Sequence, residues 1–169
     1  MHSSQLITEL ERILSKDRLV TDVETLRPYE CDGLSAYREL PVAVAIPSEI
    51  SQISAILKFC MSHEIPVVAR GAGTSLSGGA KPLKEGIVLS LARFNKILEI
   101  DPANRIARVQ PGVRNISISE AAAPFGLYYA PDPSSQIACT IGGNVAENAG
   151  GVHCLKYGLT VHNVLKVDV

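Results

Sequence analysis

The sequence lacks three features that would each place it in a particular class of protein. No apolar run approaches the roughly 18 residues that a membrane-spanning helix needs, and the N-terminus has no signal-peptide core. No Cys-x-x-Cys pair is present that could hold zinc or an iron–sulfur cluster. We therefore expect a cytoplasmic protein without a bound metal, whose cysteines are all free thiols: Cys31, Cys60, Cys139 and Cys154.

An excess of charge of one sign is also missing. The 16 basic and 17 acidic residues give a formal net charge of −1. Such a balance provides no general attraction to nucleic acid or to an anionic membrane. Hydrophobic residues make up 46% of the chain and charged residues 20%, which is typical of a globular protein. We expect no nucleic-acid partner, and any binding of phosphate must come from local groups.

Glycine, by contrast, is concentrated in two segments. The first is Arg70-Gly-Ala-Gly-Thr-Ser-Leu-Ser-Gly-Gly79, and the second runs from Pro131-Asp-Pro-Ser-Ser135 through Thr140 to Gly151. Glycine tolerates positive φ and lets backbone N–H groups approach a ligand closely, so such segments are typical of anion sites. Either segment alone could be an ordinary tight turn. Together they predict a large phosphorylated cofactor that is held from two sides.

Neither of the familiar phosphate-binding motifs fits the first segment. The dinucleotide fingerprint G-x-G-x-x-G fails because Leu76 stands where the third glycine is required. The P-loop G-x-x-x-x-G-K-[ST] fails because Gly79 and Ala80 stand in place of the lysine and hydroxyl residue. The segment therefore matches neither motif, and an ordinary tight turn stays the alternative for this segment alone.

The apolar pattern predicts an α+β fold that begins with a helix and a small β-α-β lobe. Residues 1–40 are expected to form an amphipathic helix and a connector. A short strand over 42–46, a helix from Ser48 and a strand over 67–69 then form the small lobe.

A second α+β lobe is predicted to follow. Its strands are expected over 97–100 and 105–109, and its helix over 113–125. Alternating apolar residues over 163–169 predict a further strand, and the chain stops inside it. We expect residues 41–169 to be one binding domain that is truncated at its C-terminal end, with the substrate domain absent.

The order and spacing of the two glycine-rich segments resemble the FAD-binding domain of the vanillyl-alcohol-oxidase type, also called the PCMH type. Two further stretches indicate which family within this fold the chain resembles: residues 156–160, Lys-Tyr-Gly-Leu-Thr, and residues 162–165, His-Asn-Val-Leu. They are similar to the family that contains the D subunit of bacterial glycolate oxidase and the FAD-linked D-lactate dehydrogenases. The resemblance extends over residues 20–169.

The resemblance implies a non-covalently bound FAD. The first segment would wrap the pyrophosphate with backbone amides, and the second would close over the other side. Arg70 could contact phosphate or form a structural salt bridge, and Asp132 could orient a loop amide or touch the flavin. The implied cofactor-binding residues are Arg70, Gly71, Ala72, Gly73, Thr74, Ser75, Gly78, Gly79, Pro131, Asp132, Ser134, Thr140, Gly142, Gly143, Asn144, Asn148, Gly150 and Gly151.

The resemblance also implies an activity: oxidation of a small 2-hydroxy acid, glycolate or D-lactate, by hydride transfer to the flavin. The family's catalytic residues belong to a C-terminal domain, so none is named here and residues 1–169 alone are expected to be inactive. Electrons would pass to a partner subunit that carries an iron–sulfur cluster and could hold the protein at the membrane surface. Two alternatives stay open: a non-catalytic nucleotide-binding or assembly module, and a flavoenzyme of the same fold for another hydroxy acid or alcohol.

Overall fold

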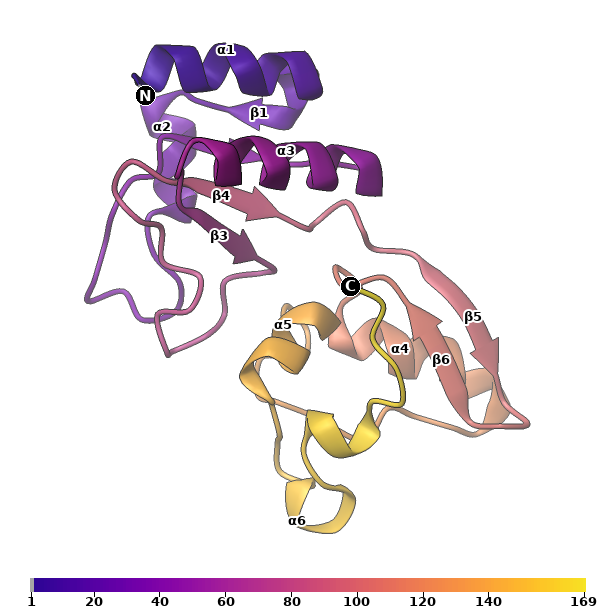
Figure 1. Cartoon of the computed structure of the whole chain (residues 1–169). Coiled ribbons are helices and arrows are strands. Elements are labelled where there is room, and N and C mark those ends of the chain that lie inside the picture. The colour runs from indigo at the N-terminus through magenta and orange to yellow at the C-terminus, as the bar shows by residue number, and fades with distance from the viewer. Residues whose placement is uncertain (1) are drawn as a thin grey trace. The chain divides into compact units, whose positions relative to one another are not determined.

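A computed structural model describes residues 2–169, which divide into two compact units between Arg93 and Phe94 (Figure 1). The first unit contains one mixed sheet with the strand order β1-β2-β4-β3. Its strands are β1 (Leu19–Val20), β2 (Ala43–Ala45), β3 (Val67–Arg70) and β4 (Ile87–Ser90). β4 runs parallel to both β2 and β3, whereas β1 is antiparallel to β2. The predicted β-α-β lobe is therefore present, with β4 lying between its two strands.

Helices cover both faces of this sheet. α1 (Ser3–Ile13) and α3 (Ile50–Ser62) lie over one face, where Leu10 and Ile56 are fully buried against Ala43 and Ile87 (Figure 1). On the other face, Leu26 packs with the alternate strand residues. It comes from α2 (Val23–Leu26), which lies between the 3₁₀ turns η1 (Lys16–Arg18) and η2 (Arg27–Tyr29). Successive strand residues face opposite sides, so β2, which is buried on both faces, is apolar throughout.

The start of α3 differs by one residue from the expected position. Glu49, rather than Ser48, occupies the N-cap. The Glu49 side chain accepts from the N3 backbone, and Gln52 Oε1 accepts from the N–H of Glu49 at 3.2 Å. This reciprocal capping box leaves Ser48 outside the helix.

The second unit pairs a β-hairpin with helices. β5 (Ile97–Asp101) and β6 (Ile106–Val109) are antiparallel, as predicted. α4 (Asn115–Ala122) continues into η3 (Ala123–Phe125) and ends at Gly126, which has a φ of 70°. The remaining elements are α5 (Ile141–Glu147), α6 (Cys154–Tyr157) and η4 (Thr160–Asn163).

One expectation for the second unit is wrong. Residues 164–169 form no strand, and no described strand pairs with them, so their apolar alternation is left exposed. An alternating pattern becomes a strand only where a partner completes its hydrogen bonds. Residues 141–147 form a helix that the sequence did not indicate, since two glycines lie in its first turn.

Two further features bear on the expectations from composition. All four cysteines are free, as predicted. Within residues 2–169, no helix combines the length and the apolar character needed to cross a membrane.

Candidate functional site

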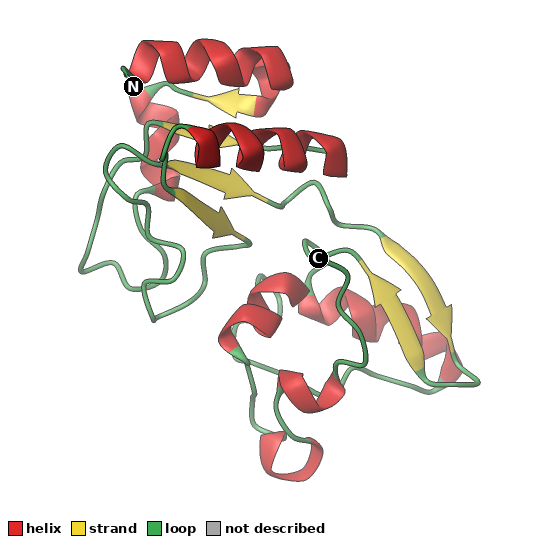
Figure 2. Ribbon diagram, in the orientation of Figure 1, coloured by secondary structure: helices red, strands yellow, loops and turns green. Residues whose placement is uncertain are grey.

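The first glycine-rich segment lies in the first unit, directly after β3. Residues 71–86 form neither helix nor strand before β4 begins (Figure 2). Gly73 and Gly78 have φ values of 71° and 78°, a region that residues with a Cβ disfavour. Ser75 Oγ accepts a hydrogen bond from the N–H of Ser77 at 3.0 Å, between these two glycines. The segment is thus a defined turn of the kind that can direct several N–H groups at an anion.

Arg70, the last residue of β3, extends beneath this loop and is only 8% exposed. Its Nη1 donates to the carbonyl oxygen of Cys31 at 2.8 Å and, more weakly, to that of Ala80 at 3.4 Å. Nη2 donates to the carbonyl oxygen of Pro28 at 3.3 Å, and Cζ lies 5.5 Å from the centre of the Tyr29 ring. Burial lowers the pKa of the guanidinium. The side chain therefore ties the loop to residues 28–31.

These contacts give Arg70 a structural role, but not through the salt bridge that the sequence suggested. Arg70 forms no ion pair within residues 2–169, and its hydrogen bonds go to backbone carbonyls, while the Asp32 carboxylate acts on it through its charge alone. Contact of this side chain with a phosphate stays a prediction. No sequence motif marks residues 28–31, so their approach to the loop could not be foreseen.

In the second unit, Thr140 and Asn148 are the N-cap and C-cap residues that flank α5. Thr140 Oγ1 accepts from the N–H of Gly143 at 3.4 Å, as an N-cap side chain does. Asn148 has a left-handed φ of 50°, and its Oδ1 accepts from the N–H of Val161 at 3.0 Å. These contacts fix the position of the helix within the unit.

Two glycines of this segment allow close packing. The N–H of Gly142 donates to the carbonyl oxygen of Pro111 at 2.8 Å. A Cβ on Gly142 would lie 2.8 Å from the Cβ of Pro111. A Cβ on Gly150 would lie 2.6 Å from Cδ2 of Leu159. Position 142 requires glycine because the ring and backbone of Pro111 occupy the space of a side chain, whereas at position 150 the end of the Leu159 side chain would have to shift.

Asp132 joins the 131–135 turn to the loop after α5. Its Oδ1 accepts from the N–H of His153 at 3.2 Å, and its Oδ2 lies 2.6 Å from His153 Nδ1. This contact with His153 holds the pKa of the Asp132 carboxyl below its ordinary value. A Cβ on Gly151 would overlap the backbone of Asp132. Asp132 thus orients a loop amide, the structural alternative raised by the sequence.

The segment also contains a buried donor without a protein partner. The side chain of Asn144 is almost fully buried, and its Nδ2 has no acceptor in the described part of the chain. Buried polar groups are nearly always paired, so an orphaned amide at a predicted cofactor residue fits a ligand oxygen. With the glycine turn of residues 71–79, this donor supports a phosphorylated, oxygen-rich cofactor.

The remaining predicted residues lie on the same segments. Five of them are half-buried or exposed: Gly71, Ala72, Thr74, Gly79 and Ser134. Pro131 is buried, and its carbonyl oxygen accepts a hydrogen bond from Asn115 Nδ2 at 2.9 Å. Because the two segments belong to different units, their joint contact with one cofactor stays a prediction. Among residues 2–169, no group of three or more His, Cys, Asp or Glu side chains could hold a metal ion.

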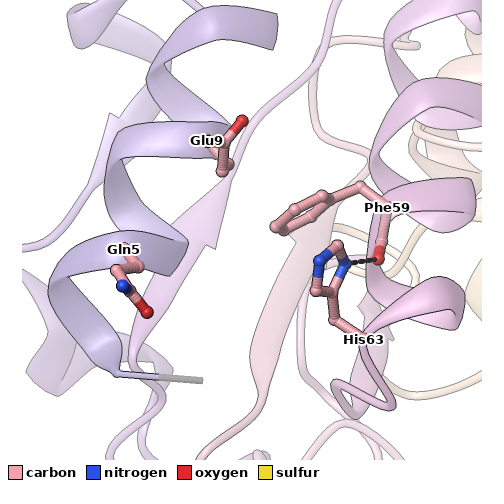
Figure 3. Close-up of a pocket in the computed structure, with 4 residues that line it drawn as sticks. All are labelled: Gln5, Glu9, Phe59 and His63. Atoms are coloured by element: carbon pink, nitrogen blue, oxygen red, sulfur yellow. Dashed lines mark hydrogen bonds between the residues drawn. The ribbon is translucent and has the colours of Figure 1, made fainter.

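A surface pocket of about 640 Å³ lies elsewhere in the first unit. Figure 3 shows Gln5 and Glu9 on α1 facing Phe59 and His63 at the end of α3. The Phe59 and His63 rings are 4.6 Å apart, and His63 Nδ1 lies 2.9 Å from the carbonyl oxygen of Phe59. No predicted cofactor residue lines this pocket.

Comparison with protein families and curated sequences identifies the family to which the chain belongs. Residues 41–169 match the family described as FAD binding domain. The chain is 62% identical over 167 residues to glycolate oxidase subunit GlcD of Escherichia coli strain K12, covering 99% of this chain and 33% of that protein. It is 46% identical over 125 residues to a D-lactate dehydrogenase of Archaeoglobus fulgidus, covering 74% and 28%. The chain thus spans about a third of the length of these relatives.

Solved structures include similar folds. A 4-ethylphenol oxidase from Gulosibacter chungangensis in complex with isoeugenol superposes with a TM-score of 0.76 at 26% identity. That similarity covers 88% of this chain and 29% of the oxidase.

Proposed function

Because the chain belongs to the FAD binding domain family, we propose that it is the FAD-binding part of an oxidoreductase for a small 2-hydroxy acid, glycolate or D-lactate. The predicted fold class, an α+β FAD-binding domain of the vanillyl-alcohol-oxidase type, and FAD as cofactor are confirmed by the family match and the solved structures. The substrate is supported by one observation above others: 62% identity along nearly the whole chain to a glycolate oxidase subunit.

The chain's own residues would bind and hold the cofactor. When bound, FAD supplies the redox chemistry by accepting a hydride from the 2-hydroxy acid. Backbone amides of Gly71, Ala72, Gly73 and Thr74 would hold the pyrophosphate, and the Asn144 amide would donate to a cofactor oxygen. Each hydrogen bond to a charged group contributes about 1.5–3 kcal/mol, so several together can retain FAD without a covalent bond.

The proposal extends to partners and place of action. The E. coli relative is named as a subunit, which supports a partner that receives the electrons. We propose that this partner carries an iron–sulfur cluster, and that the protein is cytoplasmic or attached to the membrane surface through its partners. Residues 1–169 alone would have no activity, because the residues that bind and activate the acid would lie in the part of the relatives that this chain does not cover.

Anaerobic titration of the full-length protein tests this function. Glycolate, D-lactate and L-lactate are added separately while the visible flavin absorbance is recorded. We expect glycolate or D-lactate to bleach the flavin, with L-lactate as the matched control for chirality. Flavin that stays oxidised with all three acids would contradict the proposal and favour a non-catalytic binding module or another substrate.

A further inference from the structure

The N-terminal connector, residues 31–40, contacts the first glycine-rich segment, here called the cofactor loop (residues 70–80), along most of the length of that loop. Besides the carbonyl oxygens that Arg70 binds, three consecutive residues of the connector, Asp32, Gly33 and Leu34, lie against the loop. The Leu34 side chain lies near Gly78, because a Cβ on Gly78 would be 3.8 Å from Cδ2 of Leu34. The beginning, middle and end of the loop are thus all held by residues about 40 positions earlier in the chain.

Asp32 is a buried carboxylate at the far end of the loop. It is 6% exposed, and its Oδ2 accepts from the N–H of Ala80 at 3.4 Å. Its Oδ1 accepts from the N–H of Leu34 at 2.9 Å, which fixes the carboxylate within the connector. Its charge also favours the protonated guanidinium of Arg70. A buried carboxylate is costly unless it is hydrogen-bonded, so this arrangement selects one position of the loop end.

Gly33 lies against the middle of the loop. A Cβ at this position would lie 2.7 Å from the carbonyl oxygen of Ser75 and 3.0 Å from that of Thr74. The φ of Gly33 is not in the left-handed region, so glycine is required here for space alone. The connector and the loop backbones therefore touch directly at Gly33.

We propose that Asp32 and Gly33 are positioning residues for the FAD pyrophosphate loop, which they hold in its binding conformation before the cofactor arrives. This inference rests on the proposed function only in assigning FAD to the loop. A loop that is already ordered loses less conformational entropy on binding. The connector thus raises FAD affinity through its contacts with the loop.

The test uses the full-length protein with Gly33→Ala and Asp32→Asn. Controls are Ser35→Ala, which adds no volume to the same connector, and Asp22→Asn, which keeps an N-cap acceptor for the N–H of Thr25 on α2. Three readouts are recorded: hydrogen exchange of residues 71–80 in apoprotein, the dissociation constant for FAD, and the ³¹P resonances of bound FAD.

We expect both variants to exchange faster at residues 71–80 while β4 keeps its protection. They should also bind FAD about tenfold more weakly, the cost of ordering a loop on binding, and shift the ³¹P resonances. The controls should match the wild type.

Exchange and affinity equal to wild type in both variants would overturn the inference. Loss of protection that extends through β4 would also overturn it, because the connector would then stabilise the whole unit and not the loop. Failure of the wild type to bind FAD would contradict the proposed function instead, and exchange in the apoprotein would still decide whether Asp32 and Gly33 position the loop.

Discussion

The guanidinium of Arg70 fills the space into which any side chain on Gly73 would project. A Cβ on Gly73 would overlap Nη2 and Cζ of Arg70 and lie 2.9 Å from its Nε. Arg70 cannot move aside freely, because its Nη atoms donate to the carbonyl oxygens of Pro28 and Cys31. Glycine at position 73 is therefore required by the arginine as well as by its own positive φ.

Gly73→Ala should disrupt the cofactor loop by displacing Arg70. We expect the full-length variant to lose most of its FAD during purification, as measured by the ratio of flavin to protein absorbance. The matched control is Gly126→Ala. Gly126 has nearly the same φ, 70°, but a Cβ there meets no atom within 4 Å. Both substitutions impose a backbone strain of about 1–2 kcal/mol, so a difference between them reports the overlap with Arg70. Equal flavin content in the two variants would contradict this role for Arg70.

The contact between Asp132 and His153 gives a prediction for acid pH. His153 holds the pKa of Asp132 below its ordinary value of 3.8. A carboxyl with a depressed pKa stabilises the folded state while it is ionised, and this contribution is lost as pH falls through the folded pKa. After correction for intrinsic rates, hydrogen-exchange protection of the His153 amide should decrease as the pH falls below about 4.

Asp132→Asn removes the titrating group and nearly preserves its shape. The variant should show weaker protection of the His153 amide at neutral pH and no acid-dependent decrease. Asp22→Asn, in the first unit, should leave both quantities at their wild-type values. A decrease that persists in Asp132→Asn would assign the acid sensitivity to another group.

The packing of α3 gives a prediction for cysteine reactivity. Burial raises the pKa of the Cys60 thiol to about 11. Since the thiolate is the reactive form, only about one in a thousand Cys60 side chains would be ionised at pH 8. Timed alkylation followed by mass spectrometry should label Cys31 and Cys154, which are half-buried, well before Cys60. Labelling of Cys60 as fast as Cys31 would show that α3 does not pack on the sheet as described.

Local sequence patterns predicted the elements that depend on few distant contacts. The β5–β6 hairpin was predictable because Asp101 and Asn104 form its turn, with Oδ1 of Asp101 accepting from the N–H of Asn104 at 3.0 Å. The β-α-β lobe was predictable because its strands are short apolar runs that end at prolines or glycines. The glycine-rich segments could be recognised in the sequence because local backbone geometry requires glycine at positions such as 73.

Contacts between distant residues could not be read in the same way. Asp32 and Ala80 are separated by 48 residues, and no pattern near either marks their hydrogen bond. The helix over 141–147 was missed because two glycines in its first turn disfavour a helix, yet close packing on Pro111 requires Gly142. For residues 163–169 the local pattern favoured a strand, but no strand among the described residues pairs with them, so the strand did not form.

Release of flavin by acid tests the central claim, that this chain holds FAD through two glycine-rich segments without a covalent bond. After the glycines of the first segment, the chain has Thr74 and Ser75, hydroxyl side chains that are poor nucleophiles without an adjacent base. His153 Nδ1 is engaged by Asp132. Acid precipitation of the full-length holoprotein should leave one FAD per chain in the supernatant and a colourless pellet, as quantified by chromatography. A supernatant without FAD, from a colourless protein or from a yellow pellet, would contradict the account.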